Sequence, residues 1–497
     1  MNFTLQDVAG RIPQLRWQNA QQDNPLILTL AHDSRKVEPG TLFVCIPGAT
    51  VDGHDFAEAA VQKGAVAVLA ERPLPVSLPV PVLLTPDVRK AVELISAWFF
   101  AEPARRLRMI GVTGTNGKTT TTHIIRDIFN RAGRPCGVIG TLHTLTGDQV
   151  APVKNTTPDV LDLQSSLAAM VAGGMSAVAM EVSSHALALG RVAGCEFDAA
   201  VFTNMTQDHL DFHGDLTAYR DAKATLFRLL DAADALKPNK NAIVNIDDPA
   251  GRFKLQTKQT TDNTYGIEQA ADLQAVDVII RPEGCRFRVV GRFGEFIVQS
   301  RLTGLFNIYN QLAAIGVALA EGIDIANIQA ALADFSNVPG RFERVEIDKP
   351  FSVIVDYAHT PDGLENVLRT AKQFVTGRLI AVFGCGGDRD RTKRPIMGEL
   401  AARYADRVIV TSDNPRSEEP EFIIGQIMAG IATAEAQRRT ETIADRRLAI
   451  QRAMEIAAAG DVILVAGKGH ENYQILADRT IHFDDREVVQ ELAGGKS

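Results

Sequence analysis

MIGVTGTNGKTTTT, residues 109–122, has the composition of a phosphate-binding loop placed between a buried strand and a helix. Ile110 and Val112 flank the first glycine in a short apolar run that is typical of a buried strand. The segment after the threonines, HIIRDIFNRAG, has helical spacing. Glycines let backbone N–H groups converge on phosphate oxygens, and a helix N-terminus adds partial positive charge. We therefore expect Lys118 to reach the β- and γ-phosphates of a nucleotide, and the Thr119 hydroxyl to bind Mg²⁺.

The loop departs from the spacing GxxxxGK(S/T), because Val112 occupies the position of the first glycine. This departure predicts a variant loop rather than the Walker loop of a motor ATPase. The alternative is a glycine-rich turn between strand and helix that binds no nucleotide. A Gly-Lys-Thr sequence at the very start of the helix disfavours that alternative.

Composition limits the class of protein. A chain of 497 residues suggests about three domains, and a hydrophobic fraction of 45% lets each bury a core. The net charge of −8, without a long basic block, argues against a nucleic-acid partner. The polar N-terminal segment does not resemble a signal peptide, and no apolar run approaches the ~20 residues of a spanning helix, so we expect no membrane contact. Five scattered cysteines without metal-ligand spacing indicate a reducing cytoplasm.

Alternating strand and helix patterns predict an α/β protein of three domains. Residues 1–106 indicate a smaller N-terminal α/β domain, and AEPARRLR, residues 101–108, indicates a linker. Residues 107–338 indicate a central P-loop domain with a parallel sheet, to which residues 276–303 add an antiparallel appendage. Ligands of such a sheet gather at the carboxyl ends of its strands.

The remaining residues, 339–497, indicate a C-terminal Rossmann-like domain without a phosphate loop of its own. The sequence VPGR, residues 338–341, is a hinge candidate, so we expect this domain to close over the reacting groups and exclude water. Helices of the C-terminal domain are expected at 361–374, 397–405, 420–436 and 446–459.

Polar side chains follow the predicted strands of the central domain. Glu181 comes directly after the strand AVAM, where a P-loop fold places its second metal ligand, although it could instead cap the segment SSHALALG. His209 follows the strand AAVF and would face the same edge of the sheet. At least two of Asp208, His209, Asp211 and His213 are expected to be polar surface residues. On its residues alone, Lys223 is expected to be a solvated lysine of the helix LTAYRDAKATLF.

Charged motifs also follow the strands of the C-terminal domain. Asp356 lies at a strand end, in a position suited to a ribose hydroxyl. The loop CGGDRDRTKRP at 385–395, together with SDNPRSEEP at 412–420 and AGKGHE at 466–471, crowds one edge. An arginine for a carboxylate and an acid for an ammonium would recognise an amino acid. The alternative for residues 385–395 is a solvated charged loop.

An ordered set of motifs over nearly the whole chain resembles the Mur ligase family. The set comprises TGTNGKTT, NTTPD, MEVSSHAL, TNMTQDHLDFHG, YRDAKATLF, GLFNIYN, GRFE, DYAHTPD, CGGDRDRTKRP, DNPR and AGKGHE. The resemblance implies an ADP-forming acid–amino-acid ligase of cytoplasmic peptidoglycan precursor synthesis. Such a ligase adds meso-2,6-diaminopimelate to UDP-N-acetylmuramoyl-L-alanyl-D-glutamate through an acyl phosphate, with ATP as co-substrate and Mg²⁺ as cofactor. The alternatives are a P-loop ATPase and a ligase similar to folylpolyglutamate synthase; we expect a monomer.

The resemblance also assigns residues. It implies catalytic roles for Lys118, Lys223 and His209, with Lys223 carbamylated by CO₂ so that it supports a second Mg²⁺. Metal binding is implied for Thr119, Glu181, His209 and carbamylated Lys223. ATP binding is implied for Gly114, Thr115, Asn116, Gly117, Lys118, Thr119, Thr120, Asn307, Asn310, Arg341 and Asp356.

Two further sets concern the other substrates. The UDP-muramoyl dipeptide matches Ser34, Asn155, Thr156, Thr157, Ser183 and Arg191, whereas Leu189 stands where some relatives carry glutamine. Diaminopimelate matches Arg389, Asp413, Asn414, Pro415, Arg416, Gly467 and Glu471. Arg416 is expected to pair with the distal carboxylate, which lysine lacks, while Asp413 or Glu471 takes the ammonium. A site built for a polar group rejects an analogue without it by ~10⁴ or more.

Overall fold

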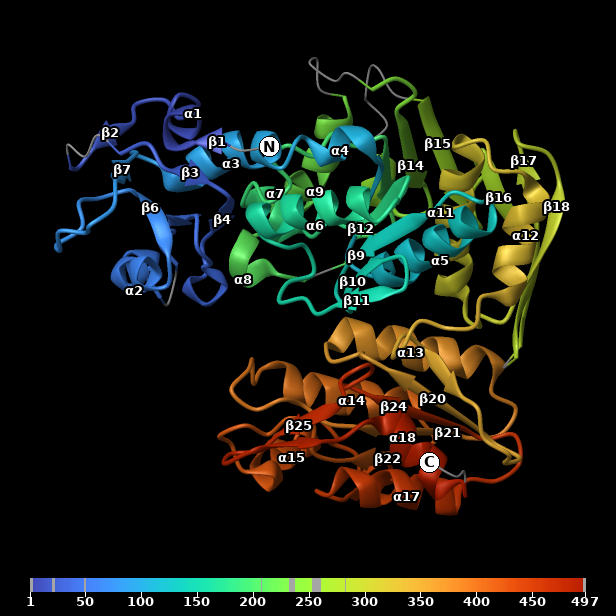
Figure 1. Ribbon diagram of the computed structural model, residues 1–497. Coiled ribbons are helices and arrows are strands. Elements are labelled where there is room, and N and C mark those ends of the chain that lie inside the picture. The colour runs from blue at the N-terminus through green and yellow to red at the C-terminus, as the bar shows by residue number, and fades with distance from the viewer. Residues whose placement is uncertain are drawn as a thin grey trace.

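Three main sheets, each covered by helices, divide the chain into an N-terminal, a central and a C-terminal domain (Figure 1). The computed structural model describes residues 3–19, 23–48, 51–206, 208–231, 237–252, 261–281 and 283–494. Within these residues, no helix is both long enough and apolar enough to cross a bilayer. The α/β class with a P-loop domain between two other domains is confirmed.

The N-terminal domain has a five-stranded sheet in the order β2-β7-β6-β5-β4, in which only β2 runs antiparallel to its neighbour. Apolar residues of the inner strands are buried on both faces. The elements are β1 (Phe3–Thr4), α1 (Leu5–Ala9), β2 (Arg16–Trp17), β3 (Leu26–Ile27), β4 (Thr29–Ala31), η1 (Ser34–Lys36), β5 (Thr41–Val44), η2 (Gly53–Phe56), α2 (Ala57–Gln62), β6 (Ala65–Ala70), β7 (Val82–Leu84) and α3 (Val88–Phe99).

The segment 101–108, expected to be a linker, is packed against the central domain. It contains a short helix, α4 (Pro103–Arg106), in which Pro103 occupies the first turn and is buried together with Ala104. Arg108 then begins the first strand of the central domain, β8 (Arg108–Thr113). The charged residues of this segment hid two apolar side chains, Ala104 and Leu107, that pack into the central core.

The central sheet has eleven strands in the order β11-β10-β9-β12-β8-β13-β14-β15-β16-β17-β18. Its middle is parallel, and the antiparallel appendage at one edge is confirmed as β16, β17 and β18. The hairpin β10–β11 at the other edge was not expected, since its strands are too short for a clear alternation. The remaining elements are α5 (Lys118–Arg131), β9 (Cys136–Ile139), β10 (Thr144–Thr146), β11 (Gln149–Ala151), α6 (Val160–Ala172), β12 (Ala177–Glu181), α7 (Ser184–Ala188), β13 (Ala199–Phe202), α8 (Leu210–His213), α9 (Leu216–Leu230), β14 (Asn241–Asn245), α10 (Pro249–Arg252), β15 (Thr261–Gly266), β16 (Leu273–Arg281), β17 (Gly284–Gly291), β18 (Phe296–Ser300), α11 (Leu305–Ala320) and α12 (Ile325–Asp334).

Strand β8 lies near the middle of this sheet and is buried on both sides. Ile110 and Val112 belong to the core that includes residues of α5, α11 and α12, whereas Met109 belongs to the opposite core with residues of α6 and α9. Alternate side chains of a strand point to opposite faces, so a continuous apolar run is what a two-sided core requires. The phosphate loop that follows is therefore held by a strand with core packing on both faces.

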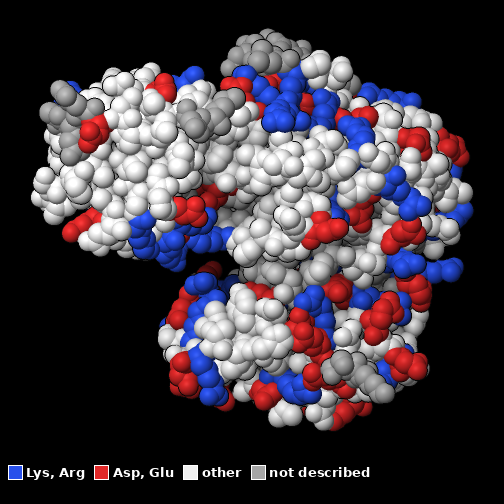
Figure 2. Space-filling view, in the orientation of Figure 1, with Lys and Arg blue, Asp and Glu red and all other residues white. Residues whose placement is uncertain are grey.

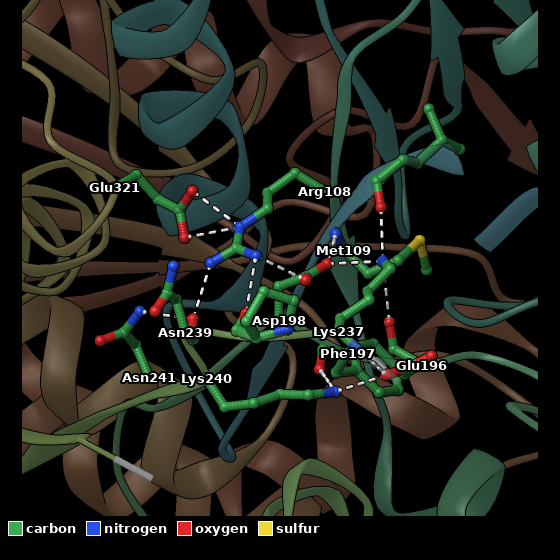
Figure 3. A network of polar contacts seen from close by, with 12 residues as sticks. Arg108, Met109, Glu196, Phe197, Asp198, Lys237, Asn239, Lys240, Asn241 and Glu321 are labelled. Atoms are coloured by element: carbon green, nitrogen blue, oxygen red, sulfur yellow. Dashed lines mark hydrogen bonds and ion pairs between the residues drawn. The ribbon is translucent and has the colours of Figure 1, made fainter. Parts of the chain in front are cut away.

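The amino end of β8 is fixed by a buried ion network at the end of the sheet opposite the loop (Figure 3). Arg108 donates to both carboxylate oxygens of Glu321 at 2.9 and 2.8 Å and to Asp198 at 2.7 Å. Asp198 also accepts from the Met109 N–H and from Lys237 Nζ, at 2.6 and 2.7 Å. The network joins β8, the segment before β13 and the end of α11, which fixes the sheet beneath the site.

The C-terminal sheet has the order β19-β20-β24-β21-β22-β23, with only β19 antiparallel. The helix predicted over 420–436 is two helices: the first ends at Met428, and Thr433 caps the second, which begins at Ala434. Between them Gly430 lies so close to the Pro395 carbonyl that a Cβ would be 1.8 Å from it. The elements are β19 (Glu343–Val345), β20 (Ser352–Asp356), α13 (Pro361–Phe374), β21 (Leu379–Phe383), α14 (Lys393–Tyr404), β22 (Arg407–Val410), α15 (Pro420–Met428), α16 (Ala434–Arg438), β23 (Thr440–Thr442), α17 (Arg446–Ile456), β24 (Val462–Ala466), β25 (Tyr473–Ile475), β26 (Thr480–His482) and α18 (Asp485–Leu492).

Candidate functional site

The phosphate loop between β8 and α5 needs its glycines. Gly114 has φ +153° and Gly117 has φ +86°, and an added Cβ would lie 1.9 Å from Thr203 Oγ1 or 2.2 Å from Asn310 Oδ1. Lys118 bends back over the loop, and its Nζ donates to the carbonyls of Gly114 and Thr115 at 3.1 and 2.8 Å. The loop thus has the backbone conformation and the lysine that a nucleotide phosphate requires.

The electrostatics of Lys118 also suit an anion. Burial lowers the pKa of its ammonium, and the cation of Arg341 lowers this pKa further, while Glu181 and Asp208 oppose the change. A phosphate group beside Nζ would favour the charged form and offset the cost of burial. Arg341 belongs to the C-terminal domain, so Lys118 and Arg341 bring positive charge to the phosphate loop from two different domains.

Glu181 ends β12, the strand beside β8, and its carboxylate is 1% exposed. It accepts from the backbone N–H and the hydroxyl of Thr141, at 2.8 and 3.1 Å. Within the described part of the chain, no cationic side chain lies within ion-pair distance of Glu181. A buried carboxylate without a cation is costly, so this group and the nearby Thr119 hydroxyl fit a divalent ion with oxygen ligands. The capping role is taken by Ser183, whose hydroxyl accepts from Ala186 N.

Lys223 is not the solvated lysine that its helix suggested. Its side chain is 1% exposed, and Nζ donates to the Gly114 carbonyl at 2.8 Å and lies 4.2 Å from the ring centroid of Tyr219. Tyr219 in turn forms a hydrogen bond with Thr115 at 3.1 Å, and burial raises the pKa of its hydroxyl to about 12. The isolated spacing of α9 could not show this, because the burying partner is the phosphate loop, over a hundred residues earlier in the chain.

His209 has left-handed backbone (φ +53°) and an exposed side chain. Its ring lies 4.7 Å from that of His185 and 6.2 Å from that of Tyr219, the residue that also covers Lys223. The side chain of Asp211 lies outside the described residues. Across the residues described, no three His, Cys, Asp or Glu side chains form a ready metal cage. That is compatible with Mg²⁺, which binds through few carboxylates and completes its shell with phosphates and water.

The residues expected to hold the acyl acceptor meet at Glu181. Thr157 donates to the Glu181 carbonyl at 2.8 Å and accepts from the Ser183 N–H at 3.1 Å, while Thr156 contacts the Thr141 hydroxyl at 3.1 Å. Arg191 donates to the Thr157 carbonyl at 3.2 Å. The expected acceptor segment and the expected metal ligand therefore share one hydrogen-bond network.

The N-terminal domain approaches this network from the other side. Lys154, next to the predicted Asn155, forms an ion pair with Asp33 at 2.9 Å, which brings the neighbouring Ser34 to the same interface. A cavity of about 270 Å³ lies between the two domains. Its lining includes His32, Ile46, Arg89, Glu93, Asp159, Leu189 and Arg191. Figure 2 shows a gap between the N-terminal and C-terminal domains, with Lys and Arg side chains on the N-terminal side of it.

The residues predicted for the nucleotide come from two domains. Asn307 and Asn310 are buried on α11 and joined by a 3.0 Å hydrogen bond, with Asn310 against Gly117. Arg341 Nε is buried and has no hydrogen-bond partner among the described residues, and its guanidinium lies over the Tyr357 ring. Burial raises the pKa of Asp356 to about 6, although its carboxylate accepts from the N–H groups of Phe342 and Ala358.

A second cluster lies in the C-terminal domain, where β21, β22 and β24 end. Asn414 donates to Glu471 at 2.8 Å, and Arg416 donates to the Gly387 carbonyl at 2.9 Å. A Cβ on Gly467 would lie 2.5 Å from Asp413 Oδ2, so these two residues touch. Pro415 and Arg389 border the same loops, and Arg389 is exposed. The structure thus brings the seven residues predicted for the amino acid to one edge of the sheet.

Other basic residues of the loop at 385–395 have structural partners. Arg394 is fully buried and pairs with Glu418 at 2.9 Å, Arg391 pairs with Glu418 at 3.2 Å, and Lys393 donates to the His359 carbonyl. Arg389 differs from the other three basic side chains of this loop: among the described residues its guanidinium donates only to the Asp388 carbonyl, within the loop itself. Residues 388–392 are exposed, whereas Arg394 is buried and joins this loop to Glu418, so the loop is solvated only in part.

Sequence reasoning missed three residues of the site. Thr141 holds the Glu181 carboxylate, Tyr219 covers Lys223, and Asp362 accepts from Asn116 Nδ2 at 3.1 Å and from Thr206 Oγ1 at 2.9 Å across the domain interface. Thr141 follows the end of β9, so the rule that strand ends carry the site could have found it. Tyr219 and Asp362 lie on helices, and no local signal distinguishes them.

Comparisons with known proteins agree with this arrangement. Residues 27–96 match the Mur ligase family, catalytic domain; residues 112–318 match the Mur ligase middle domain; residues 340–469 match the Mur ligase, glutamate ligase domain. The UDP-N-acetylmuramoyl-L-alanyl-D-glutamate--2,6-diaminopimelate ligase of Geobacillus thermodenitrificans is 50% identical over 98% of both chains.

Solved structures agree as well. A structure of a UDP-N-acetylmuramoyl-L-alanyl-D-glutamate--2,6-diaminopimelate ligase has a TM-score of 0.69 at 36% identity and covers 99% of each chain. A Mycobacterium tuberculosis folylpolyglutamate synthase complexed with ADP shares the fold, with a TM-score of 0.61 at 19% identity over 76% of this chain and 92% of that one. Three matched domains and a full-length relative at 50% identity lead to one conclusion: this chain belongs to the Mur ligase family.

Proposed function

We propose that the protein joins meso-2,6-diaminopimelate to the D-glutamate of UDP-N-acetylmuramoyl-L-alanyl-D-glutamate, with ATP converted to ADP and phosphate. One observation carries the chemistry: the phosphate loop, Glu181, Thr156 and Thr157 meet at the carboxyl end of the same sheet. A triphosphate and an acyl acceptor bound there would lie side by side. The identity of the substrates is supported by the names of relatives that match the chain over its whole length.

The reaction follows from this arrangement. The γ-carboxylate of D-glutamate attacks the γ-phosphorus of ATP, the bond to the β,γ-bridging oxygen breaks, and an acyl phosphate and ADP result. The amine of diaminopimelate then attacks the acyl carbon, and phosphate and a proton leave. Most of the catalysis is positioning and charge neutralisation, as in other phosphoryl transfers. Lys118 neutralises the transferred phosphoryl group, and Arg341 brings a second cation from the C-terminal domain.

Thr119 and Glu181 are the residues that would hold Mg²⁺, as their oxygen donors and burial suit it. Mg²⁺ bound there would reduce the repulsion between the triphosphate and the acceptor carboxylate. Thr141 orients the Glu181 carboxylate with two hydrogen bonds, so its free lone pairs face a fixed direction. His209, on the same side as Tyr219 and Lys223, is the candidate for contact with a second ion.

Lys223 is proposed to react with CO₂. The neutral amine forms an N–C bond, one proton is lost, and the product is a carbamate with a negative charge. Lys223 is 1% exposed and its Nζ lies against the phosphate loop, so the new carboxylate-like oxygens would lie beside the proposed metal ligands. The carbamate would supply hard oxygen ligands, which Mg²⁺ prefers over nitrogen.

The amino acid is proposed to bind where β22 and β24 end. Arg416 would pair with the distal carboxylate, and Asp413 with an ammonium, since Glu471 already pairs with Lys468 at 3.2 Å. We propose that residues 1–106, 107–338 and 339–497 bind the UDP-sugar, the ATP and the amino acid. The free, buried state of all five cysteines supports a reducing compartment such as the cytoplasm.

One assay tests the proposal. ADP release should require ATP, the UDP-muramoyl dipeptide and diaminopimelate together, and the product should be the UDP-muramoyl tripeptide by mass. Lysine and ornithine serve as matched amine controls. ADP release with neither substrate present would favour a P-loop ATPase, and release driven by a folate with glutamate would favour the folylpolyglutamate synthase alternative.

A further inference from the structure

A fully buried ion pair lies behind the amino-acid site, and neither of its residues has been assigned a role above. Arg446 begins α17 and Asp485 begins α18, and both side chains have 0% exposure. The guanidinium binds the carboxylate through two parallel hydrogen bonds, Nε to Oδ1 and Nη2 to Oδ2, each 2.7 Å. Such a fork-to-fork pair fixes both side chains in one orientation.

The remaining donors of Arg446 reach two strand ends. Nη1 donates to the Ser412 carbonyl at 3.3 Å, and Nη2 donates to the Ala466 carbonyl at 3.1 Å. Ser412 directly precedes Asp413, and Ala466 directly precedes Gly467. The Ala466 carbonyl ends β24, and the Ser412 carbonyl lies two residues beyond the end of β22; β21 separates these two strands in the sheet. One side chain therefore joins the two loops that touch through Asp413 and Gly467.

We propose that Arg446, held by Asp485, is a positioning residue for the amine substrate: it sets the spacing between the loops that start at Asp413 and Gly467. This inference rests on the proposed function for the identity of that substrate. The guanidinium contacts the backbone of Ser412 and Ala466 rather than the residues expected to bind the substrate. It therefore acts through the backbone of these two residues. The rigid fork can reach both carbonyls and the carboxylate at once, whereas a lysine ammonium cannot span them.

A purely structural role makes a different prediction. A buried ion pair can often be replaced by apolar residues without loss of stability, since the desolvation of both charges is then avoided. Apolar side chains cannot donate to the Ser412 and Ala466 carbonyls. The double variant Arg446→Met with Asp485→Leu therefore distinguishes the two roles. It can remain as stable as the wild type, but it loses the hydrogen bonds that set the spacing of the two loops.

The same two helices provide a matched control. Arg447 on α17 and Glu491 on α18 also form an ion pair, at 2.7 Å, but their side chains are 46% and 44% exposed. Arg447→Met with Glu491→Leu makes the same chemical change one residue further along α17, outside the site. A third variant, Arg446→Lys, keeps the buried positive charge but lacks the guanidinium that makes two parallel hydrogen bonds to the carboxylate.

The experiment measures ADP release by the full-length chain as each substrate is varied in turn. We expect the double variant at 446 and 485 to raise the KM for diaminopimelate about tenfold or more, with the KM for ATP and for the dipeptide changed less than about threefold. Arg446→Lys should fall between this variant and the wild type. The control pair at 447 and 491 should match the wild type in all three values.

Two results would overturn the inference. One is an unchanged amine KM in a folded double variant; if that variant does not fold, the same result in Arg446→Lys has the same meaning. The other is a crystal structure of either variant with Asp413 and Gly467 at their original spacing. The wild-type assay distinguishes these results from failure of the proposed function. If the wild type releases no more ADP with diaminopimelate than without it, the proposed substrate is wrong, and the crystal structures still test whether Arg446 sets the loop spacing.

Discussion

The Nζ atom of Lys223 lies 2.8 Å from the carbonyl oxygen of Gly114, so a buried lysine of α9 donates directly into the phosphate loop. We expect Lys223→Ala to lower kcat at least about 100-fold, because the variant lacks both this contact and the carbamate. Added formate or acetate should restore part of the activity by supplying carboxylate oxygens. Steady-state ADP release measures both effects.

Arg228→Ala is the control for this experiment, since Arg228 is exposed on the same helix and its side chain donates to Thr225, within that helix. It should keep wild-type activity. Full activity of Lys223→Ala without added carboxylate would end the carbamate proposal.

Arg416 is expected to decide which amine is used. The wild type should prefer diaminopimelate over lysine by ~10⁴ in kcat/KM, because lysine leaves this guanidinium without a carboxylate. In Arg416→Ala the preference should fall by about two orders of magnitude or more, mainly through a higher KM for diaminopimelate. Arg391→Ala, which changes a neighbouring arginine paired with Glu418, should keep the preference. An unchanged preference in Arg416→Ala would show that the DNPR motif has another role.

Asp362 joins the C-terminal domain to the central domain through Asn116 and Thr206. Asp362→Ala removes two cross-domain hydrogen bonds, so we expect a larger radius of gyration in small-angle scattering and a several-fold higher KM for ATP. Glu365→Ala on the same helix, α13, serves as the control, since Glu365 bonds Tyr404 within its own domain. Scattering curves that superimpose for wild type and Asp362→Ala would show that the Asp362 hydrogen bonds do not hold the two domains together. An ATP analogue with the dipeptide should close the wild type further.

Asp356 should give a pH-dependent stability difference. Burial raises the pKa of its carboxyl from the ordinary 3.8 to about 6, so the folded state binds this proton more tightly than the unfolded chain. The resulting destabilisation is fully present above pH 6 and is lost as the pH falls toward 3.8, a change of up to about 3 kcal/mol. The wild type should therefore gain stability relative to Asp356→Asn between pH 7 and pH 4.5.

Thermal melts of the nucleotide-free proteins over this pH range test the sign. The Tm of the wild type minus the Tm of Asp356→Asn should increase as the pH is lowered. Asp348→Asn, at an exposed carboxyl of the same domain, should run parallel to the wild type. Parallel curves for Asp356→Asn as well would show that this carboxyl is ionised in both states over the whole range.

Asp198 should matter for stability rather than for chemistry. Asp198→Ala leaves Arg108 and Lys237 without their shared carboxylate in a buried network (Figure 3), which costs about 3–5 kcal/mol. Glu295→Ala breaks an exposed ion pair with Arg288 in the same domain and should change the stability far less, because solvent screens such a pair. Urea unfolding followed by circular dichroism compares the two. Equal effects of both substitutions would mean that the network adds nothing beyond surface pairs.

Local features of the fold could be predicted from the sequence because short-range physics decides them. The helix expected at 361–374 begins and ends where α13 does, since Thr360 caps it and Pro361 fits its first turn. The phosphate loop follows from the spacing of its own glycines and lysine. Glu181 and residues 413–416 were found because parallel strands bring their carboxyl ends together.

The burial and pairing of charged side chains were decided only by the tertiary structure. Lys223 is buried by a loop more than a hundred residues away, Arg394 is buried by Glu418, and Arg446 is buried by Asp485. Each looks like a surface charge within its own helix. The sequence by itself determined the strands, the phosphate loop and the order of the motifs, because these depend on neighbouring residues. Which charges face a ligand, and which hold the loops around it, depends on partners that only packing of the whole chain brings within hydrogen-bond distance.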